Sequence, residues 1–324
     1  MLVDGHGRRI RYLRLSVTGR CNLQCRYCLP PARRPAASAG SCLSDEAILR
    51  VCRLLASEGV EKIRVTGGEP LLRPGVFELI RSLSSIPGVQ DISLTTNGVL
   101  LGDHASDLAA AGIRRINVSL DSLKEDRFAA ITRGGALGKV LDGLAAAEEA
   151  GLSPVKLNCV VMRGVNDDEV ADFALLTQQH SWHVRFIELM PIGPAAGSWK
   201  RLFVSSAEVR DKIAELGPLV PANSGNAAAR PVYQLPDGKG SISFVSPVTE
   251  PFCMSCDRLR LMSNGELRPC LCTDASADLG SLMASGASDS ELLEAVRGVL
   301  ADKPLCGSAE LARPRETVMA AIGG

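Results

Sequence analysis

The sequence predicts an α/β fold, an incomplete TIM-type (β/α)6 barrel closed by a smaller C-terminal α+β region. Short β-branched segments alternate six times with Ala-, Leu- and Glu-rich segments, which is typical of parallel strands joined by helices. Each β segment ends in small or polar residues, and the carboxyl ends of barrel strands form the active face. The alternation stops after about residue 216. Six units are fewer than a complete barrel has, so one side is expected to be open.

The predicted strands and helices follow from local composition. Among the helical segments, residues 44–59 begin with Ser44 as a plausible N-cap and end with Gly59, and residues 138–151 form a second clear helix. An open, doubly wound sheet has the same periodicity and remains the alternative architecture. The predicted strands span residues 11–17, 62–66, 91–96, 115–120, 155–162 and 183–189.

The C-terminal region has a different composition. Residues 217–231 are rich in Pro, Gly, Asn and Ala, which predicts a linker or surface loop. The chain is therefore divided into a barrel domain, residues 1–216, and a C-terminal region, residues 217–324. Further elements are predicted as strands at 242–246 and 258–263, a turn at 264–267 and a helix at 288–300.

Composition excludes several classes of function. The chain is 46% hydrophobic but only 4% aromatic, so its core must be mainly aliphatic. Lys plus Arg number 36 and Asp plus Glu also 36, so net charge indicates neither nucleic acid nor a membrane surface as a partner. Without a secretory signal or a membrane-spanning apolar run, the expected location is the cytoplasm. Eleven cysteines there indicate metal or redox chemistry and not disulfides.

Three cysteines directly follow the first predicted strand. Cys21, Cys25 and Cys28 are spaced C-x3-C-x2-C. Zinc in a structural site usually has four ligands, whereas a four-iron cluster on three thiolates leaves one iron open to a small molecule. The alternatives are a zinc knuckle with a distant fourth ligand, or cysteines that are simply buried.

A second cysteine group lies in the C-terminal region. Cys253, Cys256 and Cys270 are spaced C-x2-C-x13-C, and Cys272 adds a fourth thiol. Four thiolates make a closed zinc site the alternative to a second iron–sulfur cluster. The remaining cysteines are predicted to be small buried apolar residues: Cys42, Cys52, Cys159 and Cys306.

Arginines in predicted strands indicate an anionic substrate. Arg258 and Arg260 alternate along one strand and therefore point to one face. Arg14, two residues from Ser16 in the first strand, is expected to point into the barrel. Guanidinium groups gathered at one cavity suit a triphosphate. The residues alone thus predict a barrel that holds two metal clusters and an anion.

Several motifs resemble the radical S-adenosylmethionine (SAM) superfamily and, within it, the MoaA family of GTP 3′,8-cyclases. They are LRLSVTGRCNLQCRYC, KIRVTGGEPLLRP, LTTNG, RINVSLDSL, VKLNCVVMRGVND, VRFIELMP, the second cysteine group with CDRLR, and the terminal GG, so the resemblance covers nearly the whole chain. Asp257 stands where Asn is usual in that family, and Gly19 where Asp is frequent. An aromatic residue usually occupies the position of Cys272, which implies that Cys272 is not a ligand.

The resemblance implies two [4Fe-4S] clusters and SAM as cofactors. The cysteines at 21, 25 and 28 would hold the first cluster, and those at 253, 256 and 270 the second. The backbone of Gly67 and Gly68 would take the amino group of SAM, and the tail, Gly323 and Gly324, would insert into the active site as catalytic residues. The SAM-contacting positions are Tyr27, Gly68, Ser119 and Met190. The GTP-contacting positions are Arg14, Arg64, Thr95, Lys156, Arg258 and Arg260, with Lys62 and Arg185 as weaker candidates.

The implied reaction is that of a lyase in molybdenum-cofactor biosynthesis. A radical from SAM removes the 3′ hydrogen of GTP, and the sugar carbon attacks guanine C8, which gives (8S)-3′,8-cyclo-7,8-dihydroguanosine 5′-triphosphate. The second cluster would hold the guanine ring. The implied partners are an electron donor and a downstream pyranopterin monophosphate synthase, and a homodimer is possible.

Two other functions stay open at this point. One is a different radical SAM enzyme, acting for example on a peptide, whose auxiliary cluster transfers electrons. The other is a binding protein without activity that iron–sulfur or zinc sites stabilise. The CDRLR segment and the terminal glycines favour the nucleotide enzyme.

Overall fold

The computed structural model describes residues 1–30, 42–222 and 231–307. These residues form a 12-stranded sheet in the order β12-β11-β10-β1-β2-β3-β4-β5-β6-β9-β8-β7. All six predicted parallel strands are confirmed, with boundaries within one residue of those expected. They are β1 (Tyr12–Ser16), β2 (Lys62–Thr66), β3 (Asp91–Thr96), β4 (Arg115–Ser119), β5 (Val155–Val161) and β6 (His183–Glu188).

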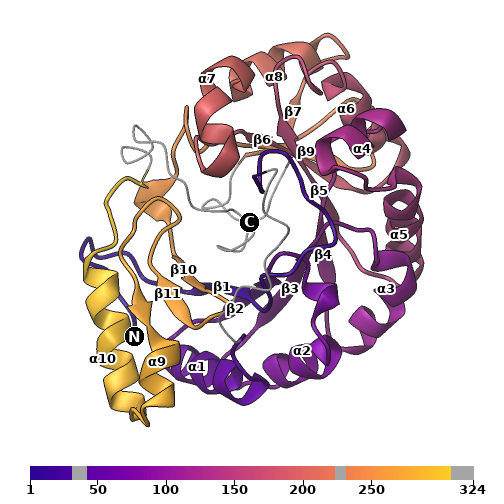
Figure 1. Cartoon of the computed structure of the whole chain (residues 1–324). Coiled ribbons are helices and arrows are strands. Elements are labelled where there is room, and N and C mark those ends of the chain that lie inside the picture. Colours follow the sequence, from indigo (N-terminus) through magenta and orange to yellow (C-terminus); the bar gives the residue numbers. More distant parts are fainter. Residues whose placement is uncertain (31–41, 223–230, 308–324) are drawn as a thin grey trace.

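The helices that connect these strands lie on one side of the sheet. Figure 1 shows the sheet curving around a central region, with α1 to α8 on the outside. A doubly wound sheet would carry helices on both faces. The helices are α1 (Asp45–Ser57), α2 (Val76–Ser84), α3 (Leu101–Ala110), α4 (Glu125–Thr132), α5 (Leu137–Glu149), α6 (Val170–Gln179), α7 (Trp199–Leu202), α8 (Ser206–Ala214), α9 (Leu279–Ala284) and α10 (Asp289–Ala301). Short 3-10 turns are η1 (Pro70–Leu72), η2 (Gly193–Ser198) and η3 (Cys253–Ser255).

The C-terminal region extends the sheet at both ends. β10 (Arg258–Leu261) pairs in parallel with β1, and β9 (Ser241–Val245) pairs in parallel with β6. β10 and β11 form an antiparallel hairpin, so the expected turn at 264–267 is confirmed in position, but its residues 266 and 267 already belong to β11. The remaining strands are β7 (Val220–Ala222), β8 (Val232–Gln234), β11 (Glu266–Arg268) and β12 (Ala277–Asp278).

The expected linker at 217–231 is partly wrong. Its residues 220–222 form β7, which pairs antiparallel with β8 at one end of the sheet. Pro221 is tolerated there because proline is compatible with an edge strand. Pairing between strands thus overrides a local composition that is typical of loops. Residues 223–230 lie outside the described part of the chain.

Helix capping and an aliphatic core stabilise the framework as expected. The Ser44 hydroxyl accepts a hydrogen bond from the amide of Ala47 at 3.2 Å, which caps α1. The buried face of α1 includes Ile48, Val51 and Leu55, which pack into the main core. No helix in the described ranges is both long enough and apolar enough to cross a membrane.

Candidate active site

The first cysteine group lies in a loop that follows β1. The carbonyl of Cys25 accepts hydrogen bonds from the amides of Cys28, at 2.9 Å, and Leu29, at 3.0 Å, which makes a tight turn. The amide of Arg26 donates to the carbonyl of Ile131 in α4 at 2.9 Å. Cys21, Cys25 and Cys28 are all partly exposed, so the thiols are held on a fixed turn but remain accessible.

The GGEP turn contacts the segment that leads into the cysteine loop. The amide of Gly68 donates to the carbonyl of Thr18 at 2.8 Å, and the amide of Glu69 donates to that of Arg20 at 2.7 Å. A Cβ atom at Gly68 would lie 2.2 Å from the Arg20 oxygen and 3.0 Å from the Cβ of Cys21. Two motifs that are far apart in sequence therefore meet at a contact that only glycine permits.

Glu69 joins two of the strand-end motifs. Its buried carboxylate accepts hydrogen bonds from the Thr96 hydroxyl at 2.9 Å and the Asn97 amide at 2.8 Å. Burial raises the pKa of Glu69 to about 7, although these hydrogen bonds oppose the rise. The Asn97 side chain in turn lies 3.8 Å from the sulfur of Cys21. Glu69 thereby fixes the ends of β2 and β3 beside the first cysteine group.

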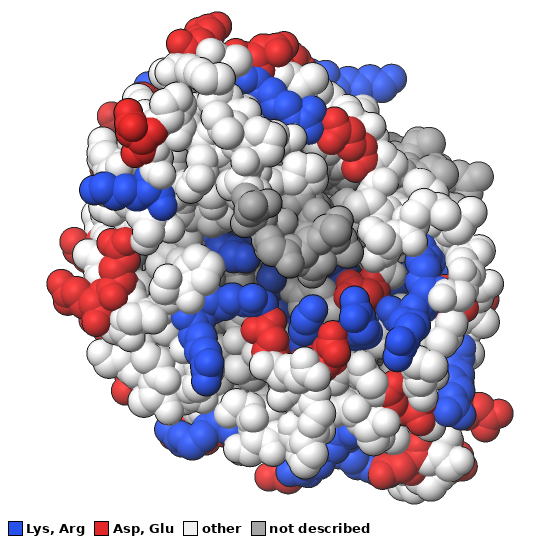
Figure 2. Space-filling model, turned by 180° about the vertical axis from the view of Figure 1, so that it is seen from behind, with Lys and Arg blue, Asp and Glu red and all other residues white. Residues whose placement is uncertain are grey.

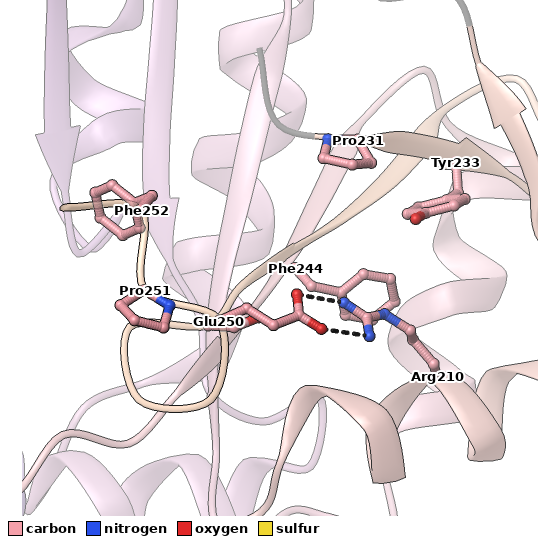
Figure 3. A pocket seen from close by; sticks show the side chains of 8 residues that line it. Arg210, Pro231, Tyr233, Phe244, Glu250, Pro251 and Phe252 are labelled. Carbon is pink, nitrogen blue, oxygen red and sulfur yellow. Dashed lines mark hydrogen bonds and ion pairs between the residues drawn. The ribbon is translucent and has the colours of Figure 1, made fainter. Parts of the chain in front are cut away.

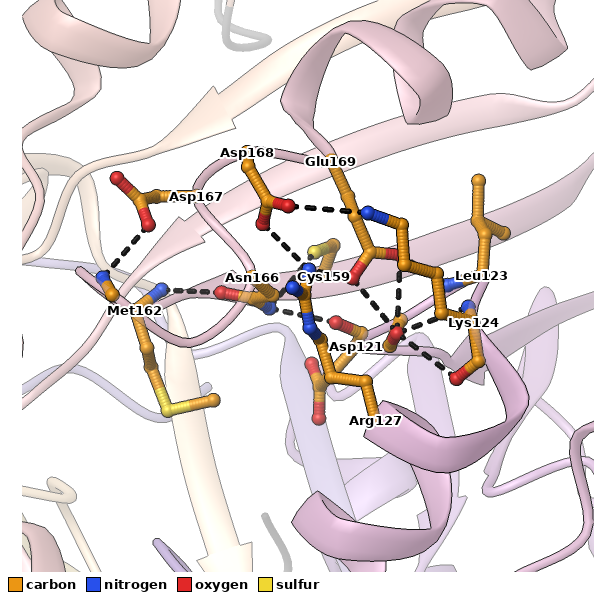
Figure 4. Close-up of polar contacts among 12 residues, drawn as sticks. Asp121, Leu123, Lys124, Arg127, Cys159, Met162, Asn166, Asp167, Asp168 and Glu169 are labelled. Carbon is orange, nitrogen blue, oxygen red and sulfur yellow. Dashed lines mark hydrogen bonds and ion pairs between the residues drawn. The ribbon is translucent and has the colours of Figure 1, made fainter.

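The buried carboxylate of Asp121 fixes the position of Tyr27. Its hydroxyl donates to Asp121 at 2.7 Å, and the other Asp121 oxygen accepts from the amide of Val160 at 2.8 Å. Burial raises the pKa of Asp121 to about 6. Asn166 bridges the carbonyl of Asp121, at 2.7 Å, and the amide of Met162, also at 2.7 Å (Figure 4). Sequence reasoning missed this network, which joins the loops after β4 and β5.

Three of the four predicted SAM contacts, Tyr27, Gly68 and Ser119, lie in or beside these loops. Tyr27 packs in a small apolar cluster with Leu189 and Met162, beside the end of β6. Met190 follows Leu189 but packs instead beside the second cysteine group, against Ile192 and Met262. Ser119 is the last residue of β4, two positions before Asp121.

The second cysteine group is assembled from two segments. Cys253 begins the η3 turn, and its carbonyl accepts from the amide of Cys256 at 3.1 Å. Cys270 follows β11, and its sulfur accepts from the amide of Cys272 at 3.4 Å. A further hydrogen bond from the Cys272 thiol lowers the pKa of Cys270, while the pKa of Cys272 is raised. This arrangement favours Cys270 as the thiolate and buried Cys272 as its donor.

The other cysteines fit the sequence expectation only in part. Cys52 and Cys159 are buried, as predicted, but Cys42 is exposed and Cys306 is only partly buried. Cys42 precedes the cap of α1 and therefore lies outside the face that packs on the core. Within the described residues, no three His, Cys, Asp or Glu side chains gather as ligands of one metal ion.

Arginines from neighbouring strands form a row on the inner face of the sheet. Arg14 lies between Arg260 and Arg64 in strand register. Burial lowers the pKa of Arg14, and the positive charges of Arg260, Arg64 and Arg258 lower it further. Burial likewise lowers the pKa of Arg64 and of Arg260. Figure 2, which views the molecule from behind, shows Lys and Arg side chains gathered around the middle of that side. Such crowding of like charges is relieved by a bound anion.

Tyr12 is an aromatic residue beside this row that sequence reasoning missed. It lies in register with Arg258 and Lys62, and the guanidinium groups of Arg64 and Arg258 lie 5.3 and 5.9 Å from its ring centroid. These are cation–π distances, so the ring separates the two arginines. The alternation of Tyr12, Arg14 and Ser16 along β1 was the signal that placed all three on one face.

A second row lies across β3 to β6. Thr95 is in register with Asn117, Asn117 with Lys156, and Lys156 with His183. Burial, together with the positive charges of Arg185 and Arg115, lowers the pKa of Lys156 to about 8. Arg185 donates a hydrogen bond to Asn117. Five of the six predicted GTP residues therefore fall into these two rows, and Arg258 is in register with Tyr12 instead.

A pocket lies outside these rows, beside the second cysteine group. It has a volume of about 340 Å³, and Figure 3 shows Arg210 and Glu250 facing each other in it through two hydrogen bonds of 2.9 Å. Phe252 lines the pocket, and the guanidinium group of Arg258 lies 4.7 Å from the centroid of its ring. The Arg210–Glu250 pair thus braces the loop that leads to Cys253.

Comparison with known proteins defines the class. Residues 15–177 match the model of the radical SAM superfamily, and residues 182–307 match the model described as Molybdenum Cofactor Synthesis C. The fold is similar to that of Streptococcus suis SuiB bound to S-adenosylmethionine, with a TM-score of 0.60 and 14% identity, over 90% of this chain and 69% of SuiB. The chain belongs to the radical SAM superfamily.

Closer relatives define the family within it. The chain is 48% identical over 304 residues to the GTP 3′,8-cyclase of Pelotomaculum thermopropionicum, covering 93% of each chain. It is 44% identical over 325 residues to that of Moorella thermoacetica, covering 99% of each. The chain is a member of the GTP 3′,8-cyclase family.

The residues present fit the cofactors of this family, two [4Fe-4S] clusters and SAM. Each cysteine group supplies three thiols, and because every thiolate of a cubane binds a different iron, the thiols need not converge on one point. The close packing of Gly68 against the backbone of Arg20 holds the GGEP turn beside Cys21, so the first cysteine group and this turn lie together at one place. Gly323 and Gly324 lie outside the described residues.

Proposed function

We propose that this chain converts GTP to (8S)-3′,8-cyclo-7,8-dihydroguanosine 5′-triphosphate in molybdenum-cofactor biosynthesis, with SAM as cosubstrate. The observation that carries the proposal is the position of Arg260. Burial and the charge of Arg258 lower the pKa of Arg260, and the nearby thiols of Cys270 and Cys256 oppose this decrease. Arg260 is therefore the member of the row of arginines that lies beside the second cysteine group, which suits a nucleotide whose phosphates contact arginine and whose base contacts a cluster.

The domain arrangement is part of the proposal. Residues 1–216 form the incomplete (β/α)6 barrel, and residues 217–324 form the C-terminal region that closes its open side. The pairing of β9 with β6 and of β10 with β1 supports this assignment, because both strands come from the C-terminal region.

The residues of the chain divide the work between two ends of the cavity. Cys21, Cys25 and Cys28 hold the first cluster, and Tyr27, Gly68, Ser119 and Met190 position SAM. When bound, the cluster and SAM supply the radical that starts the reaction. At the other end, the cysteines at 253, 256 and 270 hold the second cluster. Arg14, Arg64, Thr95, Lys156, Arg258 and Arg260 bind GTP, with Lys62 and Arg185 as weaker contacts. Holding the 3′ carbon and C8 of GTP in place limits side reactions of the radical.

Partners and the tail complete the proposal. An electron donor must reduce the first cluster, and a pyranopterin monophosphate synthase would take the product. The terminal Gly323 and Gly324 are proposed to reach the active site, since a dipeptide without side chains can enter a narrow space.

Incubation of anaerobically reconstituted protein with GTP, SAM and dithionite tests the proposed reaction. Mass spectrometry should detect 5′-deoxyadenosine and a product with the mass of GTP, separated from it by chromatography. Guanosine in place of GTP should give little product, because the arginines then have no phosphates to bind. Cleavage of SAM without consumption of GTP would indicate a radical SAM enzyme with another substrate. Absence of SAM cleavage would indicate a binding protein.

Lys156 gives the GTP site a pH dependence. Its amine is charged below pH about 8 and loses its proton as the pH rises through that value. The triphosphate is already fully ionised there, so GTP affinity should fall by roughly tenfold between about pH 7 and 9, as expected for a lost charged hydrogen bond. Equilibrium dialysis with labelled GTP measures this change.

Two variants separate Lys156 from the general effect of pH. Lys156→Met should bind GTP more weakly at pH 7 and should show little further change up to pH 9. Lys139→Met removes an exposed lysine from α5 and should retain the dependence of the native protein. An unchanged pH profile in Lys156→Met would remove Lys156 from the GTP site.

A further inference from the structure

Lys303 is a buried lysine that the reaction described above does not use. Its side chain is almost completely buried, with 2% of the residue exposed. The ammonium donates to the carbonyl of Pro269 at 3.0 Å and to the carbonyl of Arg258. A buried charge is costly unless it is well paired, and neither of these partners carries a negative charge.

The two carbonyls belong to the two segments that build the second cysteine group. Arg258 begins β10 two residues after Cys256, and Pro269 directly precedes Cys270. Burial lowers the pKa of Lys303, and the thiols of Cys256 and Cys270 oppose this change. The ammonium therefore lies near two of the three thiols and behind the backbone that carries them.

Arg8 ties the third cysteine to the same segment. It donates to the carbonyl of Cys253 at 2.6 Å and to the carbonyl of Pro304 at 2.8 Å. Its own position is fixed by an ion pair with buried Asp4 at 2.6 Å. Lys303 thus contacts the segments that carry Cys256 and Cys270 through their backbone carbonyls. Arg8 contacts the carbonyl of Cys253 and also that of Pro304, the neighbour of Lys303.

We propose that Lys303 is a positioning residue for the second cysteine group, which holds the Cys256 and Cys270 segments at the separation that a cluster requires and places a fixed positive charge behind their thiolates. The inference rests on the proposed function only in taking this group to bind a cluster. A nearby positive charge stabilises the more negative, reduced state of a cluster. Lys303 should therefore raise the reduction potential of the second cluster.

Lys303→Met tests this proposal because methionine is similar in length and has no charge. The variant is compared with the native chain and with Lys139→Met, which removes an exposed lysine on α5. Iron content and SAM affinity are measured in the full chain. The potential of the second cluster is measured by spectroelectrochemistry after Cys25→Ala has also been introduced, since only the second cluster is expected to remain.

Lys303→Met should either lose about four of eight irons while it binds SAM normally, or keep them with a more negative potential for the second cluster. Native SAM binding shows that the barrel has folded. Unchanged iron content and potential would overturn the proposal. Loss of both clusters together with SAM binding would also overturn it, because Lys303 would then support the whole fold. None of these results depends on whether the native protein converts GTP, because GTP conversion is tested in a separate experiment.

Discussion

Replacing Cys25 with alanine should abolish cleavage of SAM while the protein keeps about half of its iron. Native protein reconstituted without oxygen should bind about eight irons, the sum of two cubanes. Cys25 lies in the turn closed by Cys28 and Leu29, and we propose it as one of the three ligands of the first cluster. Loss of one of three thiolates should therefore empty the first site, while the second group, which lies in the η3 turn and after β11, is untouched. Iron and sulfide analysis, together with chromatography of 5′-deoxyadenosine, measures both effects.

Cys52→Ala is the matched control. Cys52 is a buried cysteine of α1 outside both groups, so its loss should leave iron content and SAM cleavage at native levels. The protein should only become less stable, since a small buried side chain is removed. Stoichiometric zinc together with the iron of one cubane would contradict the two-cluster interpretation and would favour a zinc site that includes Cys272.

Gly68→Ala should severely weaken SAM binding and deplete the first cluster. The added methyl group would lie 2.2 Å from the Arg20 oxygen and 2.6 Å from its carbonyl carbon. These are backbone atoms that cannot rotate away, so the loop carrying Cys21 must shift. Overpacking of this kind typically costs about 1–3 kcal/mol, and we expect a loss of SAM affinity of roughly tenfold or more. Calorimetric titration with SAM measures the effect.

Gly138→Ala is the control for the glycine substitution. A Cβ atom at Gly138, in α5, meets nothing within 4 Å. Alanine there should leave SAM affinity unchanged and slightly increase stability, because alanine favours helix more than glycine does. Iron retained in the second cluster of Gly68→Ala reports that the rest of the chain is folded. Native SAM affinity in Gly68→Ala would show that this contact does not define the site.

The six parallel strands β1 to β6 could be predicted because each is a short apolar run between Gly, Pro and polar residues. The position of β10 beside β1 could not be predicted in this way. Alternation shows which face of a strand a residue occupies, but not which strand from a distant part of the sequence will pair with it. The same limit applies to β7, whose composition resembles a loop until it is paired with β8.

Candidate site residues could be named from the sequence where the residue type itself suggests a chemistry. They were missed where the role depends on contacts that form only in the folded chain. Cysteine spacing and strand arginines each have a signature in the sequence, and they predict metal and anion sites directly. Asp121 and Lys303 have no such signature, because their importance depends on Tyr27 in one case and on two carbonyls in the other. Tyr12 was also missed, but a signal for it was present, since its alternation with Arg14 in the sequence places both on one face of β1.

The pairing of β1 with β10 and of β6 with β9 also constrains how the chain folds. Both outer strands of the six-stranded parallel unit remain exposed edges until residues 241–261 have left the ribosome. Exposed strand edges are sites of intermolecular pairing and aggregation, and contacts between such distant residues slow folding. A nascent chain that ends near residue 216 therefore has two unpaired strand edges, those of β1 and β6, which can pair with other chains. We expect chaperone protection to matter most between the synthesis of residue 216 and that of residue 261.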